Sequence, residues 1–170
     1  MNKSLSLKPF QESPSNKEIL FSWSKNNKTI TLRYELLGFV DVLWPEINKN
    51  QRKFDLWKHT CFELFLKKEN EDRYLEFNFS PSHEWDSYEF QSYRKPQPVV
   101  RFESPVVIIK TYDYILEVEL ELPPSWLDAE LKASATAVIE TKSHETSFFA
   151  FKHSSEPDFH DQSTFIINFD

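Results

Sequence analysis

The chain has 170 residues, 39% of them hydrophobic and 16% aromatic, and a formal net charge of −7 at pH 7. This length predicts one domain over residues 1–170, and an acidic chain without a basic stripe excludes nucleic acid as an expected partner. No apolar run approaches the roughly 20 residues of a membrane span, and the single Cys61 with no secretory signal predicts a cytoplasmic protein without disulfides and without a membrane partner.

The first part of the chain alternates apolar and polar residues, which is typical of β-strands. We expect a short edge strand over residues 5–10 and two longer strands over residues 19–24 and 29–37. Gly38, the only glycine, is expected to end this pair or to sit in a bulge. Residues 39–55 contain Pro45 and many polar side chains, so the sequence predicts a long loop there, with a short helix as an alternative.

The central pair of strands is expected over residues 60–67 and 73–80, joined by the charged turn KENED. Strand side chains alternate between the two faces, so each strand can be sorted by parity. One face is uniformly apolar and predicts core: Phe62, Leu64, Leu66, Leu75, Phe77 and Phe79. The other face mixes aromatic, acidic and amide groups, which favours a binding face: His59, Cys61, Glu63, Phe65, Tyr74, Glu76, Asn78 and Ser80.

The second half of the chain predicts more strands. They are expected over residues 84–91, 99–103, 106–112, 114–122, 132–141, 146–152 and 164–169. In LEVELEL the leucines and valine alternate with glutamates, as in an antiparallel strand with one buried face. A short helix is expected in PPSWLDAEL, because proline is favoured in the first helical turn. Ten or eleven strands with frequent turn signals predict an all-β fold, an antiparallel β-sandwich.

Three stretches carry a resemblance to a known group. LWKHTCFELFL, YLEFNFSPSHEWDSYEFQSYR and SFFAFKHSSEPDFH occur in order and span residues 56–160. Together they resemble the DOMON-like domain proteins of bacteria, which are related in fold to the family-nine carbohydrate-binding modules. The resemblance implies an immunoglobulin-like or jelly-roll sandwich with a ligand face on one sheet.

The resemblance also implies roles for individual residues. The ligand-contacting glutamate and asparagine of the sugar-binding relatives fall on Glu63 and Asn78, and a family arginine falls on Arg94. Relatives of this kind commonly clamp the sugar between two tryptophans, whereas this chain has Phe149 where a tryptophan is expected. A salt bridge that holds a loop is an alternative role for Arg94.

The sharpest constellation is Glu63, Glu76 and Asn78 on one face, because carboxylates and amides bind sugar hydroxyls. Trp57 and Trp85 are candidates for stacking on the apolar face of a sugar. The alternative is that the polar groups form a structural network. The two glutamates would suit a glycosidase if their carboxyls lay about 5 Å apart, whereas Cys61 is expected to be core.

His59, His153 and His160 lie near strand ends and form a second, weaker set of ligand-binding candidates. Their spacing fits no zinc motif, and the only methionine, Met1, offers no axial haem ligand, so no metal and no cofactor are expected. The sequence therefore predicts a small-molecule-binding domain for a carbohydrate or sugar derivative. A sugar-acting enzyme and a non-catalytic interaction module stay open as alternatives, and the sequence leaves the oligomeric state undefined.

Overall fold

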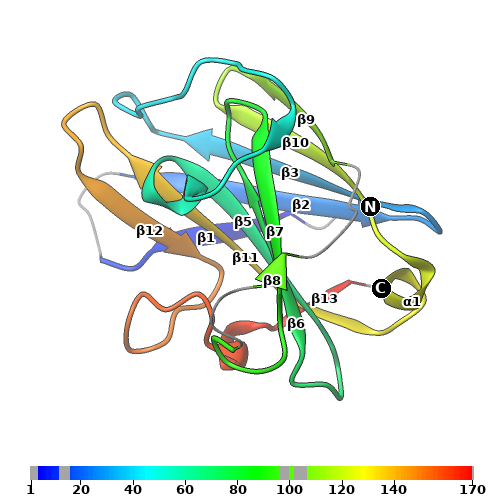
Figure 1. Ribbon diagram of the computed structural model, residues 1–170. Coiled ribbons are helices and arrows are strands. Elements are labelled where there is room, and N and C mark those ends of the chain that lie inside the picture. Colours follow the sequence, from blue (N-terminus) through cyan, green and yellow to red (C-terminus); the bar gives the residue numbers. More distant parts are fainter. Residues whose placement is uncertain (1–3, 12–15, 96–99, 102–106, 170) are drawn as a thin grey trace.

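A computed structural model describes residues 4–11, 16–95, 100–101 and 107–169 (Figure 1). The regular secondary structure of the described part is almost wholly β, as expected. The strands are β1 (Leu5–Pro9), β2 (Glu18–Lys25), β3 (Thr29–Leu37), β4 (Gln51–Arg52), β5 (Cys61–Lys68), β6 (Tyr74–Phe79), β7 (Glu84–Phe90), β8 (Val100–Arg101), β9 (Val107–Tyr112), β10 (Ile115–Glu121), β11 (Leu131–Glu140), β12 (Thr146–Ala150) and β13 (Ile167–Phe169). The helices are single turns: η1 (Leu56–Lys58), α1 (Pro124–Leu127) and η2 (Gln162–Thr164).

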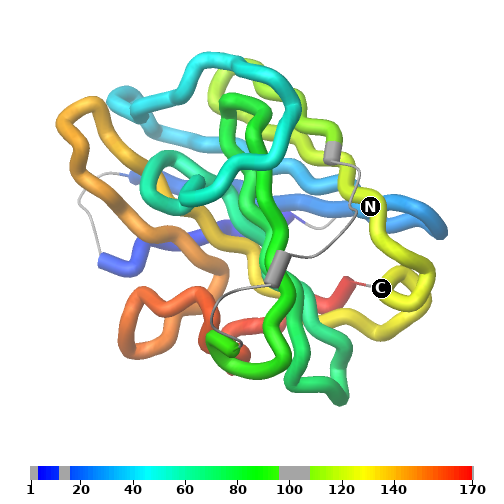
Figure 2. Tube along the Cα trace, viewed as in Figure 1, coloured from blue at the N-terminus to red at the C-terminus, as the bar shows by residue number. Residues whose placement is uncertain are grey.

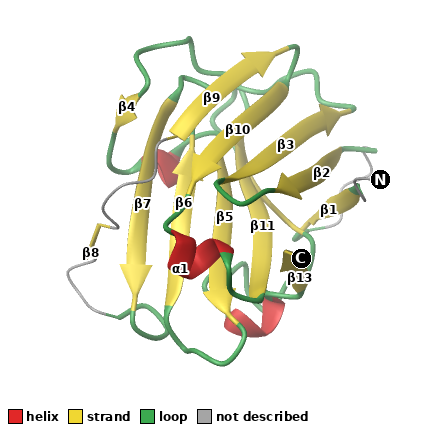
Figure 3. Cartoon of the chain, turned by 90° about the vertical axis from the view of Figure 1, so that its right-hand side faces the viewer, coloured by secondary structure: helices red, strands yellow, loops and turns green. Residues whose placement is uncertain are grey.

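The strands form one continuous hydrogen-bonded path in the order β4-β7-β6-β5-β11-β12-β1-β2-β3-β10-β9. β1 joins the two halves of this path, because it pairs with β2 on one side and with β12 on the other. One pair, β4 with β7, is parallel, so the expectation of purely antiparallel strands is corrected to a mixed, curled sheet. Figure 3 shows β9, β10, β3 and β2 crossing over β7, β6, β5 and β11.

One apolar core lies between the two halves of the sheet. Phe62, Leu64, Leu66, Leu75, Phe77 and Phe79 are fully buried in it, which confirms the parity assigned to the central strands. From the other half, the Tyr34 ring packs 5.0 Å from that of Phe62, and its hydroxyl donates to the backbone oxygen of Glu63 over 2.8 Å. Because the Tyr34 hydroxyl is satisfied there, it can lie in the core without a desolvation penalty.

The opposite face of the β5–β6–β7 sheet carries a second, smaller aromatic cluster: Phe65, Tyr74, Tyr88, Phe90 and Phe165, with Trp57 and Phe159 packed against it. This cluster has the parity that the sequence assigns to the polar face. Loops rather than strands cover it. The chain therefore presents a half-covered aromatic face on the side away from the main core.

Several boundaries differ from the sequence prediction. Residues 39–55 form a long connection that contains the short strand β4 and one isolated bridge, between Val42 and Thr141. Figure 2 shows this connection in cyan, beside β7. The helix α1 is only four residues long, and the last strand begins three residues later than predicted because η2 occupies Gln162–Thr164. Most of the strand expected at residues 99–103 lies outside the described residues. No helix within the described ranges could cross a membrane.

Gly38 ends β3 with a backbone φ of +76°, a conformation that side chains rarely adopt. A Cβ atom added there would meet the backbone oxygen of Asn16 at 2.7 Å. We therefore expect Gly38→Ala to lower the free energy of unfolding by roughly 1–3 kcal/mol, measured by urea denaturation.

The matched control for Gly38→Ala is a substitution in the β9–β10 hairpin. The two-residue loop of this hairpin, Asp113 and Tyr114, also has positive φ angles, of 48° and 61°. Such a loop is the type I′ turn that glycine favours. Asp113→Gly should therefore change stability by less than about 1 kcal/mol. Equal losses in both variants would show that the Gly38 contact does not control stability.

Candidate binding site

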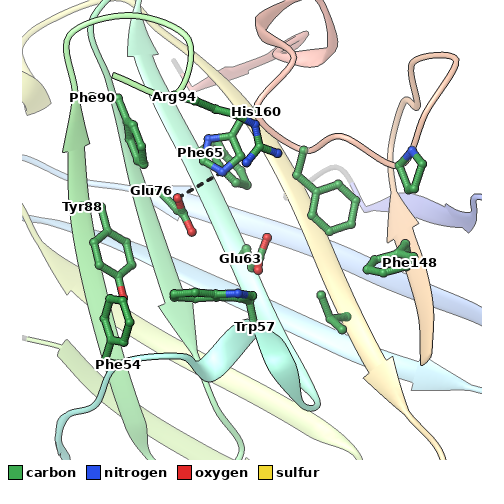
Figure 4. Close-up of a pocket in the computed structure, with 13 residues that line it drawn as sticks. Phe54, Trp57, Glu63, Phe65, Glu76, Tyr88, Phe90, Arg94, Phe148 and His160 are labelled. Carbon is green, nitrogen blue, oxygen red and sulfur yellow. Dashed lines mark ion pairs between the residues drawn. The ribbon is translucent and has the colours of Figure 1, made fainter. Parts of the chain in front are cut away.

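A cavity of about 390 Å³ opens on the aromatic face of β5, β6 and β7 (Figure 4). This volume lies within the range of small-molecule sites. Its lining comes from the strands β5, β6, β7, β11 and β12, from the helical turn η1, and from three loop segments. The lining residues are Phe54, Trp57, Glu63, Phe65, Glu76, Tyr88, Phe90, Arg94, Val138, Phe148, Pro157, Phe159 and His160.

Strand register brings the two carboxylates to the floor of this pocket. Glu63 of β5 lies opposite Asn78 of β6, and Phe65 lies opposite Glu76. Paired residues of an antiparallel sheet point to the same face, so both glutamates and the asparagine share it. Figure 4 shows both carboxylates between Trp57 at one end and His160 at the other. Only 3% of Glu63 and 6% of Glu76 is exposed.

Neutral groups hold the two carboxylates in place. Thr136 of β11 donates its hydroxyl to Glu63 Oε2 over 3.1 Å, and Asn78 donates its amide to Glu76 Oε1 over 2.9 Å. The other amide atom of Asn78, Oδ1, is buried and meets no donor among the described residues. Asn78 therefore orients Glu76 from beneath the pocket. Contrary to the sequence prediction, Asn78 itself does not line the cavity.

Burial makes ionisation of both glutamates unfavourable. Loss of water, together with the nearby Glu76 carboxylate, raises the pKa of Glu63 well above its ordinary value. Burial also raises the pKa of Glu76 to about 7, although the hydrogen bond from Asn78 opposes this shift. Near neutral pH these groups therefore offer both acceptors and a carboxylic acid proton that can donate.

A chain of hydrogen bonds fixes His160 above Glu76. The Arg94 backbone N–H donates to the Tyr74 hydroxyl over 3.1 Å, and the same hydroxyl is hydrogen-bonded to His160 Nδ1 over 2.9 Å. When the Tyr74 hydroxyl is the donor, the proton of neutral His160 resides on Nε2, which lies 3.6 Å from Glu76 Oε2 (Figure 4). Burial lowers the pKa of His160 to about 4, so this imidazole is neutral at pH 7.

Arg94 lies at the rim of the pocket. Its guanidinium donates to Asp158 Oδ1 over 2.9 Å, and nearly half of its side chain is exposed. The positive φ of Arg94, 52°, belongs to the turn that follows β7. The salt bridge that the sequence left open as a structural role for Arg94 is therefore present, and it ties this turn to the loop after β12.

Aromatic rings form the walls. Trp57 of η1 meets Phe54 and Tyr88 edge to face, with ring centroids 5.2 and 6.1 Å apart. Phe90 and Phe65 each pack about 5 Å from His160, with centroids 5.1 and 5.2 Å away. These rings offer C–H and π surfaces beside the carboxylates, which suits a ligand with both an apolar face and polar substituents.

The expected aromatic clamp at Phe149 lies on the wrong face and is corrected. Phe149 pairs with Ala137 and is buried in the main core, 5.5 Å from the ring of Phe39. Its neighbour Phe148 pairs with Val138 and lines the pocket instead. Alternation along β12 means that a one-residue shift moves a side chain to the opposite face.

Three other candidates lie away from the pocket among the described residues. Trp85 pairs with Phe79, packs on the main core and donates its indole N–H to Asn50 over 3.0 Å. His59 bonds Glu140 over 2.8 Å, and His153 bonds the backbone oxygen of Lys8 over 2.7 Å. The three histidines therefore do not converge on one metal position. Within the described ranges no group of three potential metal ligands is present.

The comparisons with known proteins concern the fold. No family model and no curated protein matches this sequence. Two of the solved structures that are similar to this chain match almost all of it. A protein from Bacteroides uniformis, described as a "putative carbohydrate-binding protein", is 15% identical with a TM-score of 0.68, over 98% of this chain and 84% of that one. A carbohydrate-binding module of family 9 from Caldicellulosiruptor kristjanssonii, in complex with cellotriose, is 9% identical with a TM-score of 0.57, over 97% and 80%. At these identities the likeness shows the fold alone.

Proposed function

We propose that this chain is a small-molecule-binding module for a sugar or a sugar derivative. The observation that carries the proposal is the pocket itself: two buried carboxylates, Glu63 and Glu76, open into an aromatic cavity on the side away from the core. A ligand that fits must offer hydrogen-bond donors to the floor and an apolar face to the walls. Sugars do both, because their hydroxyls project mainly around the rim of the ring and their C–H groups form an apolar face.

The fold supports this proposal independently. One of the solved structures similar to this chain is a family-9 module in complex with cellotriose, and another is described as a "putative carbohydrate-binding protein". The DOMON-like relationship, with a β-sandwich scaffold, stays part of the proposal on the motifs around Glu63 and Asn78. So does a cytoplasmic location, for which the buried, free thiol of Cys61 is the available support.

A calorimetric titration panel tests the proposal. We expect one or more monosaccharides or disaccharides to bind with a dissociation constant in the millimolar range or tighter. Trp57→Ala and Glu63→Gln should each weaken that binding about tenfold, since each removes one wall or one acceptor. Glu119→Gln, an exposed glutamate on β10, is the charge-matched control and should bind like the wild type. No binding across the panel at millimolar sugar would overturn the proposal.

A second candidate, hydrolysis of a glycoside, rests on the same pair. Glu63 and Glu76 occupy diagonal positions on adjacent strands, and burial raises the pKa of both, as a general acid requires. Turnover of nitrophenyl glycosides that is lost in Glu63→Gln and in Glu76→Gln would favour the enzyme. Binding without turnover would exclude the hydrolase and support the binding module.

A further inference from the structure

The two acidic side chains of the pocket have only neutral hydrogen-bond partners among the described residues. The hydrogen-bond partners of Glu63 and Glu76 are Thr136 and Asn78, both neutral. No lysine or arginine nitrogen among the described residues forms an ion pair with either carboxylate. His160 comes nearest, at 3.6 Å from Glu76, but burial lowers the pKa of His160 to about 4, so its ring is neutral at pH 7.

Arg94, the one cationic side chain in the lining, is already committed. Its guanidinium pairs with Asp158 over 2.9 Å at the pocket rim. A buried carboxylate is normally paired or hydrogen-bonded by charged partners, because an uncompensated charge is costly to bury. Elsewhere in this chain that expectation holds: buried Asp86 pairs with Arg52, and buried Glu84 pairs with Lys53. The pair in the pocket therefore differs from Asp86 and Glu84.

The walls beside the pair are suited to a positive charge. Five aromatic side chains line the pocket together with the carboxylates: Trp57, Tyr88, Phe65, Phe90 and Phe148. The electron-rich faces of aromatic rings attract cations. A bare metal ion is a poor occupant, because rings supply no ligand atoms and a hard cation requires about six oxygens. An organic ammonium group needs only a few hydrogen-bond acceptors and an apolar surrounding.

We propose that the natural ligand presents a protonated amine to Glu63 and Glu76, so that within the sugar class this pocket prefers an amino sugar over its neutral parent. This inference rests on the proposed function for the position of the site, and it adds the chemical class of the ligand. The ammonium group would donate to both carboxylates, while the sugar ring would lie against the aromatic walls near Trp57. Because burial favours the protonated form of both carboxyl groups, an ammonium ligand would shift them to the ionised form on binding and supply the counter-charge.

The test compares three sugars that share one ring. Glucosamine, glucose and N-acetylglucosamine are titrated into the full chain at about pH 6.5, where an aliphatic amine is protonated. We expect glucosamine to bind at least about tenfold more tightly than either neutral sugar, as a charge-assisted hydrogen bond in a dry site should provide. Tetramethylammonium chloride, with sodium chloride as its ionic-strength control, tests the attraction of the site for positive charge without the sugar ring and without an N–H donor.

Substitution of the acids provides the decisive control. In Glu63→Gln and in Glu76→Gln the preference for glucosamine over glucose should fall to about one, whereas Glu119→Gln on β10 should retain it. Each glutamine keeps the shape and one acceptor, so folding is preserved, and thermal unfolding of each variant checks this directly.

The outcomes separate this inference from the proposed function. Equal binding of glucosamine and glucose would overturn the amine preference and leave sugar binding intact. Binding of tetramethylammonium that depends on Glu63, without binding of any sugar, would support the cation site and overturn the sugar. No binding of the sugars or of tetramethylammonium would overturn both.

Discussion

Replacing Phe77 with alanine is expected to lower the free energy of unfolding by about 3–5 kcal/mol. The Phe77 ring is fully buried on the core face of β6, with Leu64 and Ser87 as its strand partners, and stacks parallel to Phe79 with centroids 6.3 Å apart. Truncation removes apolar burial and leaves a cavity that a closely packed interior cannot fill. Denaturant unfolding monitored by circular dichroism measures the loss.

Phe54 gives a matched aromatic control for Phe77, because 54% of it is exposed at the pocket rim. Phe54→Ala should cost less than about 1 kcal/mol, since little of its surface is removed from water. If Phe77→Ala cost no more than Phe54→Ala, the assignment of core and pocket faces would be wrong.

Replacing Glu76 with glutamine is expected to stabilise the protein at alkaline pH. Burial raises the pKa of Glu76 to about 7, whereas 4.5 is the ordinary value. Because the folded-state pKa lies above the unfolded one, the contribution of Glu76 to stability is complete below about pH 4.5 and is lost as pH rises through 7. The gap between the two pKa values corresponds to roughly 3 kcal/mol at pH 8, which the neutral amide would not lose.

The measurement is the difference in unfolding free energy between Glu76→Gln and wild type at several pH values. The difference should be small near pH 4 and should grow to about 2–3 kcal/mol in favour of the variant near pH 8. Taking a difference removes most of the opposing titrations elsewhere. Asp86 and Arg94 act on Glu76 in the folded state and remain present in both proteins. A Glu76→Gln variant that is less stable at pH 8 would show that ionised Glu76 has a stabilising partner.

Much of the fold follows from alternation in the sequence. The parity of residues 60–67 and 73–80 correctly separated the core side chains Phe62, Leu64 and Phe77 from the face that bears Glu63 and Glu76. Parity works here because each strand is buried on both sides but against different chemistry, apolar on one side and mixed on the other. The parallel β4–β7 pairing could not be predicted, because it consists of only two residue pairs whose members lie more than 30 positions apart in the sequence.

The site was less predictable, because parity assigns a face only within a strand whose register is known. Tyr88 pairs with Glu76, so the sequence did contain the signal that Tyr88, not Trp85, shares the face of the carboxylates. Pairing β7 with β6 in this register would have predicted that Tyr88 and Phe90 both line the pocket. The error at Phe149 has the same origin, one residue of shift along β12.

The loop contributions to the pocket have no comparable signal. Phe54 arrives from the long connection before η1, and Phe159 arrives from the segment after β12. Their positions depend on contacts between distant parts of the chain, such as the Arg94–Asp158 ion pair and the Lys53–Glu84 pair. No local periodicity encodes such contacts, so the walls of the pocket appear only in three dimensions.

The central claim, that a ligand occupies this pocket, is tested most directly by the indole N–H signals of the five tryptophans in a nitrogen-15 NMR titration. Trp57 lines the pocket, whereas Trp126 is buried in the main core and Trp23 packs on Phe169. Comparison with Trp57→Phe assigns the relevant signal. On addition of glucosamine or glucose, the account predicts a saturable shift of the Trp57 signal with Trp126 and Trp23 unchanged. Saturable shifts of the other indoles while Trp57 stays fixed would place the ligand elsewhere and contradict the account.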